Sequence, residues 1–120
     1  MNPLDIHHVS VNVADVPESI AFYTDVLGGV IRGDRPDLGV AGAWINLGSS
    51  QIHLIEAPVP QNMGQHFAIR VGDLDAAVTE LRSKGVEVGE PFGVGLNRQT
   101  FVGDPSGNII ELHEVGAVTQ

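Results

Sequence analysis

Three histidines and one glutamate are the residues of this 120-residue sequence whose types and spacing suggest chemistry: His8, His53, His66 and Glu111. His8 and His66 are 58 residues apart, and so are His53 and Glu111. Imidazole and carboxylate groups are ligands that Zn²⁺, Ni²⁺, Co²⁺, Mn²⁺ and Fe²⁺ accept. The spacing therefore predicts a site for one divalent metal ion, of undetermined identity, if the fold brings the four side chains together.

The same offset aligns longer blocks of the chain. The stretch "HVSVNVADVPESI" (residues 8–20) matches "HFAIRVGDLDAAV" (residues 66–78), and "QIHLIEA" (residues 51–57) matches "IIELHEV" (residues 109–115). One gap-free offset that joins two separate blocks indicates an internal repeat. We predict one domain over 1–120, made of a module at about 4–57, a linker at about 58–65 and a second module at about 66–116.

Each copy shows the same order of elements. A strand (residues 6–13, then 66–71) precedes a helix, for which Asp15 and Asp73 are expected N-caps and Gly28 and Gly85 expected stops. Three shorter strands follow, near 30–33, 41–47 and 51–56 in the first copy and near 86–88, 99–103 and 108–114 in the second. The pattern predicts an α+β fold of two βαβββ modules, whose sheets would form a half-barrel.

Alternation along the strands separates two faces. In the first strand the valines share the face expected under the helix, whereas His8, Ser10 and Asn12 share the other. The same alternation places all four metal-ligand candidates on the face away from the helices. His7 is in phase with the valines, so we expect it to be structural or exposed.

Other residues of the open face are candidates for binding a substrate. Arg70 would be a rare cation in a chain of formal charge −9, and it could hold a carboxylate or phosphate or simply be a surface residue. Arg98, in "GVGLNRQTF", is expected in a loop or at a strand start near the rim. The full set of substrate-binding candidates is Ser10, Asn12, Gln51, Arg70, Arg98 and His113.

Several stretches resemble the vicinal oxygen chelate superfamily. "HHVSVNV" with "DVPESIAFYTDVLGG" resembles its opening, and "QHFAIRVGDLDAAVTELRSKGV" and "DPSGNIIELHE" resemble the start and end of its second module. The superfamily includes glyoxalase I, methylmalonyl-CoA epimerase, extradiol dioxygenases, and fosfomycin and bleomycin resistance proteins. The resemblance implies a glyoxalase-like fold of paired βαβββ modules that form a cup around a divalent metal, with ligand positions matching His8, His53, His66 and Glu111.

His53 departs from the pattern of this superfamily. Glyoxalase I typically carries Glu at this position and the epimerase carries Gln, whereas extradiol dioxygenases and fosfomycin enzymes use only the other three positions. His53 could therefore be a fourth ligand or an acid–base group beside a three-ligand site.

The resemblance implies three alternative functions for the chain. The first is a metal-dependent glyoxalase-like enzyme of lyase or isomerase type. It would chelate oxygens of a small substrate and transfer a proton next to a carbonyl, with Glu111 and His53 as catalytic groups. The second is an extradiol-type Fe(II) dioxygenase that uses His8, His66 and Glu111. The third is a bleomycin-resistance-like binding protein, although such binders generally lack these ligands. A homodimer is also implied.

Composition excludes other classes of function. Only six Lys and Arg stand against 15 Asp and Glu, so nucleic acid is not an expected partner. No apolar run reaches the roughly 20 residues of a membrane span, and the N-terminus does not have the pattern of a secretory signal. The sequence has no cysteine, which excludes disulfides and thiolate chemistry and fits a cytoplasmic protein.

Overall fold

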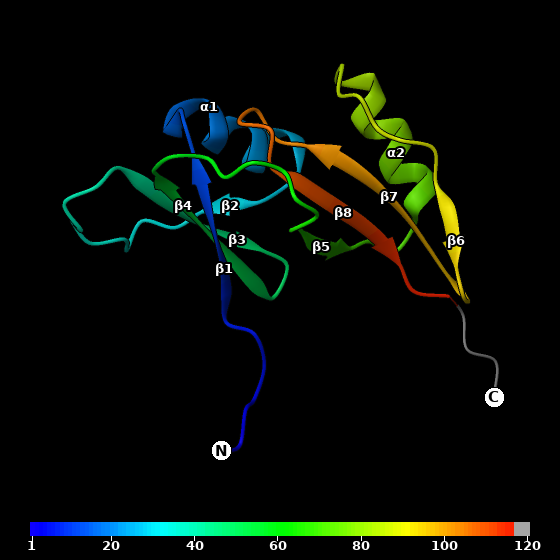
Figure 1. Ribbon diagram of the computed structural model, residues 1–120, viewed down its shortest axis with the longest axis horizontal. Helices are drawn as coiled ribbons and strands as arrows, with labels where there is room; N and C mark the ends of the chain where they lie inside the picture. Colours follow the sequence, from blue (N-terminus) through cyan, green and yellow to red (C-terminus); the bar gives the residue numbers. More distant parts are fainter. Residues whose placement is uncertain (117–120) are drawn as a thin grey trace. The chain divides into compact units, whose positions relative to one another are not determined.

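The computed structural model describes residues 1–116 and divides the chain into two compact units (Figure 1). The first unit is Met1–Gln61, and the second begins at Asn62. Their boundary falls inside the linker predicted at 58–65. No helix among residues 1–116 is both long and apolar enough to cross a bilayer.

The first unit contains one four-stranded mixed sheet and a short helical segment. Its strands are ordered β1-β4-β3-β2, with β1 parallel to β4 and the other neighbours antiparallel. In chain order the elements are β1 (His8–Val13), α1 (Val16–Ala21), the π-helical turn η1 (Phe22–Val26), β2 (Val30–Ile31), β3 (Gly42–Leu47) and β4 (Ser50–Glu56).

The second unit repeats this topology with the strand order β5-β8-β7-β6, in which β5 is parallel to β8. Its elements are β5 (Phe67–Arg70), α2 (Leu74–Ser83), β6 (Phe92–Val94), β7 (Asn97–Gly103) and β8 (Ile109–Glu114). The predicted βαβββ order is therefore confirmed in both modules.

Both predicted N-caps are confirmed. The Asp15 carboxylate accepts a hydrogen bond from the Glu18 amide at 2.9 Å, and the Asp73 carboxylate accepts one from the Ala76 amide at 3.0 Å. The first helix does not stay α-helical as far as Gly28, because its end widens into η1. There the Leu27 amide bonds to the carbonyl of Phe22, five residues earlier, at 3.0 Å.

The predicted strand at 86–88 is wrong. Only Val88 forms an isolated bridge, to Val102, because the segment is tied to the end of α2 instead. The Val86 amide bonds to the Leu81 carbonyl, and the Arg82 guanidinium donates to the Val88 carbonyl at 3.0 Å. The second strand of this unit in chain order is instead β6, which turns into β7 through two residues, 95 and 96.

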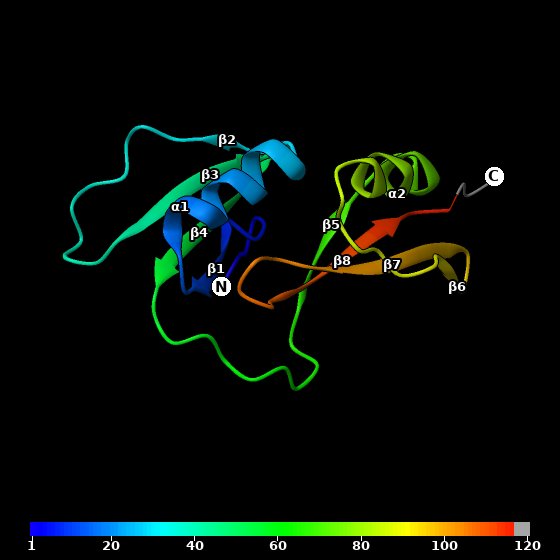
Figure 2. The same cartoon turned by 90° about the horizontal axis from the view of Figure 1, so that it is seen from above.

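Each sheet has one face covered by its helix and one face without a helix (Figure 2). In the first unit, the buried side chains of β1 and β4 under α1 include Val11, Val13, Ile52 and Leu54. In the second, α2 covers Ile110 and Leu112 of β8. Because alternate residues point to opposite faces, the candidate residues of β1, β4 and β8 lie on the face away from the helix.

Candidate functional site

In the first unit His8 and His53 lie side by side. The parallel pairing of β1 with β4 sets His8 opposite Gln51 and Ser10 opposite His53. The two imidazole rings are stacked, with centroids 3.8 Å apart and planes 13° apart. The other face of His53 stacks on Trp44 of β3 at 4.7 Å. His53 is therefore held between an imidazole and an indole.

The surroundings of His53 favour a neutral imidazole. Burial lowers the pKa of His53 below its ordinary value of 6.5, and positive charge on His8 or His7 lowers it further. Its Nε2 lies 2.9 Å from the side-chain oxygen of Gln51, which can only accept a hydrogen bond. Nε2 therefore carries the proton, and Gln51 binds His53.

The stacking also limits how these histidines can bind a metal. The lone pair of a ring nitrogen lies in the plane of the ring, so an ion must lie in the planes of all its imidazole ligands. The nearly parallel planes of His8 and His53 do not meet near the rings. In this arrangement only one of the two can bind a given ion: His8 through Nε2, or His53 through Nδ1, the nitrogen that its bond to Gln51 leaves bare.

His7 contacts His8 directly. Their Nδ1 atoms are 2.9 Å apart, so one nitrogen donates and the other accepts. The sequence did not indicate this contact, because strand alternation places the two residues on opposite faces. When Nδ1 of His8 is the donor, Nε2 of His8 is bare and is the atom available to a metal.

In the second unit His66 and Glu111 form the corresponding pair. His66 directly precedes β5, and Nε2 of its ring lies 3.1 Å from Oε1 of Glu111. Its Nδ1 donates to the Gly64 carbonyl at 2.8 Å, and the ring meets the ring of Phe101 edge-on at 5.3 Å. The Gly64 carbonyl, with Glu111 adding to it, raises the pKa of His66 above the ordinary 6.5.

These atoms fit a divalent metal by their chemistry. Nε2 of His66 and Oε1 of Glu111 share one proton when the ring is protonated, and a metal cation can bind both atoms in place of that proton. The Glu111 side chain is only 11% exposed, so its charge lies where a compensating cation is favourable. Among residues 1–116, no three His, Asp or Glu side chains are gathered closely enough to hold an ion as a group.

The raised pKa of His66 predicts a pH dependence for the metal-free protein. The His66–Glu111 pair should contribute its full stabilisation below pH 6.5 and lose it as pH rises through the raised pKa of the folded state. A proton NMR titration of the His66 ring should give a midpoint above 6.5, and Glu111→Gln should lower that midpoint. A wild-type midpoint below 6.5 would contradict the assignment.

His113 and Asn97 extend the pair in the second unit. Nδ1 of His113 lies 2.8 Å from Oε2 of Glu111, and Nε2 of the same ring lies 3.0 Å from Nδ2 of Asn97. The Gly116 amide donates to Oδ1 of Asn97 at 2.9 Å. His113 was expected to bind substrate, but both of its ring nitrogens are engaged within the protein.

The four remaining substrate-binding candidates are Ser10, Asn12, Arg70 and Arg98, and they differ in their surroundings. Ser10 is exposed beside His53, and Asn12 donates to the Pro58 carbonyl at 3.0 Å, so Asn12 holds the start of the linker. Arg70 is exposed on the Glu111 face and forms no ion pair with a carboxylate among residues 1–116. Arg98 makes two 3.0 Å bonds to Asp75 of α2, which places it on the helix side of the sheet.

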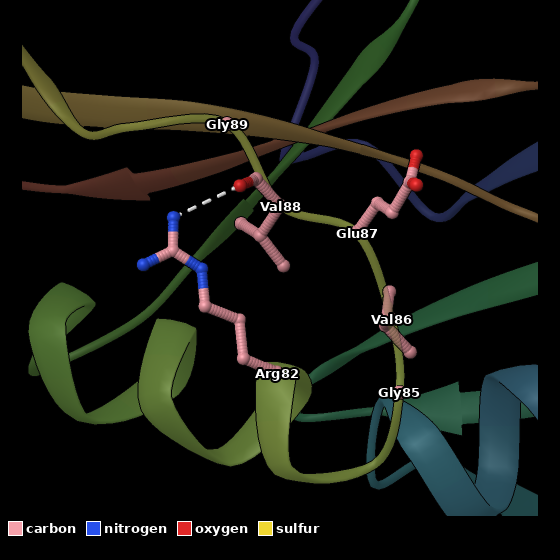
Figure 3. A pocket seen from close by; sticks show the side chains of 6 residues that line it. All are labelled: Arg82, Gly85, Val86, Glu87, Val88 and Gly89. Atoms are coloured by element: carbon pink, nitrogen blue, oxygen red, sulfur yellow. Dashed lines mark hydrogen bonds between the residues drawn. The ribbon is translucent and has the colours of Figure 1, made fainter.

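A cavity of about 780 Å³ lies elsewhere in the second unit, at the end of α2 (Figure 3). Its lining residues are Arg82, Gly85, Val86, Glu87, Val88 and Gly89. The Arg82 guanidinium is bonded to the Val88 carbonyl and to Glu90, so the charge of Arg82 is already compensated. None of the candidate site residues lines it.

The sequence profile of the Glyoxalase/Bleomycin resistance protein/Dioxygenase superfamily matches residues 5–112. The chain belongs to this superfamily. The match spans both modules and includes His8, His53, His66 and Glu111. The recognition made from the sequence and the glyoxalase-like fold class are both confirmed.

Known proteins similar to this superfamily member differ in function. "Glyoxylase I 4" of Arabidopsis thaliana is 33% identical, over 92% of this chain and 72% of its own length. A Bacillus anthracis structure, described as a glyoxalase family protein, has a TM-score of 0.81 at 30% identity, covering 96% and 98% of the two chains. The fosfomycin resistance protein FosX of Listeria monocytogenes, solved with Mn(II), shares the fold (TM-score 0.79, 19% identity, 95% and 93% coverage).

Proposed function

We propose that this protein is a metal-dependent, glyoxalase-like enzyme that transfers a proton next to a carbonyl of a small substrate. The observation that carries the proposal is the His66–Glu111 pair on the open face of its sheet, with Nε2 and Oε1 3.1 Å apart. The resemblance to the superfamily supports His8 as the proposed third ligand, through its Nε2. A metal held by these three residues would polarise the substrate carbonyl.

His53 and Glu111 are the proposed proton-carrying groups. The lowered pKa of His53 leaves its ring neutral at pH 7, and a neutral imidazole can accept a proton through its bare nitrogen. The stacking on Trp44 and the bond to Gln51 fix the orientation of this ring. We assign His53 as an acid–base group beside the ligands, and Glu111 as a ligand whose carboxylate can also accept a proton.

We propose that the substrate carries a carboxylate or phosphate group held by Arg70. This guanidinium lies on the strand next to Glu111, since Ala68 pairs with Glu111 and Arg70 with His113. The chain has 15 acidic residues, yet Arg70 forms an ion pair with none of those among residues 1–116. Ser10 lies next to His53 and is the proposed hydroxyl contact with the substrate.

Metal analysis of the wild type, His8→Ala and His53→Ala tests the assignment of the ligands. We expect about one divalent ion per chain in the wild type, its loss in His8→Ala and its retention in His53→Ala. Equal loss in both variants would show that His53 is a fourth ligand. A wild type that binds no metal under any loading condition would contradict the enzyme proposals and favour a binding protein.

An extradiol-type Fe(II) dioxygenase is the second candidate. The stacking lets only one of His8 and His53 bind a given ion, which leaves two histidines and one carboxylate, the ligand set of many non-haem Fe(II) oxygenases. Oxygen uptake by the iron-loaded protein on a catechol would favour this reaction. Exchange of a substrate proton with deuterated solvent, without oxygen uptake, would favour proton transfer.

We further propose that the protein is a homodimer, as the resemblance to its superfamily implies. Sedimentation at micromolar concentration should give twice the chain mass of 12.7 kDa. A monomer alone under these conditions would contradict the dimer.

A further inference from the structure

We propose that Asn97 and His113 form a positioning pair that holds Glu111 with Oε1 turned toward His66. The proposal extends the proposed function, because it assigns two residues to the orientation of a metal ligand. All atoms of the hydrogen-bond chain lie in the second unit. The direction of each bond follows from the one before it.

The chain of donors begins at the Gly116 amide, which can only donate. Oδ1 of Asn97 accepts this bond at 2.9 Å, so the other end of the Asn97 amide is its NH₂ group. That group can only donate, and it lies 3.0 Å from Nε2 of His113. Nε2 of His113 must therefore be the bare, accepting nitrogen.

The proton of His113 is consequently on Nδ1. This N–H donates to Oε2 of Glu111 at 2.8 Å, while Oε1 faces Nε2 of His66 at 3.1 Å. The carboxylate is thus held at both oxygens, and its side chain is only 11% exposed. A metal replacing the proton of His66 would meet Oε1, because Oε2 is occupied.

The backbone around Gly116 supports the pair. A Cβ atom at Gly116 would collide with the carbonyl oxygen of Leu96, so only glycine lets this backbone approach the turn between β6 and β7. The approach brings the Gly116 amide to Asn97 at the start of β7. The residue equivalent to His113 in the first module is Ile55, which has no side-chain N–H, so the pair is specific to the second module.

Four variants test the proposal: His113→Leu, His113→Asn, Asn97→Leu and Gln99→Leu. His113→Leu removes the donor to Glu111, whereas His113→Asn keeps an N–H near the place of Nδ1. Asn97→Leu removes the group that sets the tautomer. Gln99 pairs with His113 across β7 and β8 and has no hydrogen bond to Glu111 among residues 1–116, so Gln99→Leu is the matched control.

Nitrogen-15 NMR of the metal-free protein should show His113 protonated on Nδ1 and bare on Nε2. Asn97→Leu should populate both tautomers. The ring nitrogens of His66 should shift in His113→Leu but stay near the wild-type values in His113→Asn and Gln99→Leu. A wild-type proton on Nε2 of His113, or unchanged His66 shifts in His113→Leu, would overturn the proposal.

Zn²⁺ affinity, measured by competition with a chelator, supplies the second readout. Outer partners of metal ligands typically contribute about 10- to 100-fold, so we expect a loss of that size in His113→Leu and little loss in His113→Asn. Equal affinity in His113→Leu and Gln99→Leu would overturn the positioning role. A wild type that binds no Zn²⁺ would contradict the proposed function, while the NMR results would still decide the positioning pair.

Discussion

Replacing Glu111 by glutamine is expected to abolish stoichiometric metal binding. Glutamine keeps the shape of the side chain but removes the one negative charge among the proposed ligands. Its amide oxygen can accept only one of the two bonds from His66 and His113, because the NH₂ group that replaces the other oxygen cannot accept. The affinity for Zn²⁺ should therefore fall by more than the roughly 10- to 100-fold expected for loss of an outer partner. Equilibrium dialysis with metal analysis measures the effect.

Glu114→Gln is the matched control for this variant. Glu114 lies on the same strand, β8, but its carboxylate accepts a hydrogen bond from the Leu74 amide at the start of α2, at 2.8 Å. This substitution should leave metal binding unchanged and slightly weaken the start of the helix. Equal metal loss in the two variants would show that general loss of charge is responsible, and not the position of Glu111.

The two Leu→Ala variants Leu54→Ala and Leu112→Ala are expected to have the largest effects on stability. The residues occupy repeat-equivalent positions in β4 and β8, and they are 0% and 3% exposed. Truncating a buried leucine typically costs about 2–5 kcal/mol, because apolar burial is lost and a cavity is left. Small domains have only about 5–15 kcal/mol of stability in total. Urea unfolding followed by circular dichroism measures the loss.

Leu38→Ala is the control for both core variants, because Leu38 is 57% exposed. Its unfolding free energy should stay within about 0.5 kcal/mol of the wild type. A loss in Leu54→Ala or Leu112→Ala no larger than that of Leu38→Ala would contradict the assignment of these leucines to the cores.

The order of elements could be predicted from local patterns in the sequence. Asp15 and Asp73 cap their helices because a carboxylate reaches an amide three residues ahead, which is a local interaction. The alternation of valine and polar residues assigned the faces of the first strand for the same kind of reason. The strand predicted at 86–88 failed because the bond from Arg82 to the Val88 carbonyl and the bond from the Val86 amide to the Leu81 carbonyl hold that segment at the helix end.

The residues of the candidate site could be named from the sequence, but their partners could not. The 58-residue repeat identified His8, His53, His66 and Glu111 from the sequence alone, since repeated modules place equivalent residues on equivalent strands. Arg98 was named from its expected place near the rim, and its two bonds to Asp75 of α2 could not be predicted from local sequence. Arg70, by contrast, is left without a carboxylate partner among the described residues.

The sequence by itself determined the family, the two βαβββ modules and the residue types that can bind a metal. Only the tertiary structure decided the partners of those residues: the stacking of His53 between His8 and Trp44, the bond from His113 to Glu111, and the bond from Asn97 to His113. Alternation along a strand sets the face on which a side chain lies. Both ring stacks and the bond from Asn97 join residues of neighbouring strands, so no local pattern predicts them. Glu111 lies two residues from His113 on the same strand, and the bond between them depends on the ring orientation that Asn97 holds.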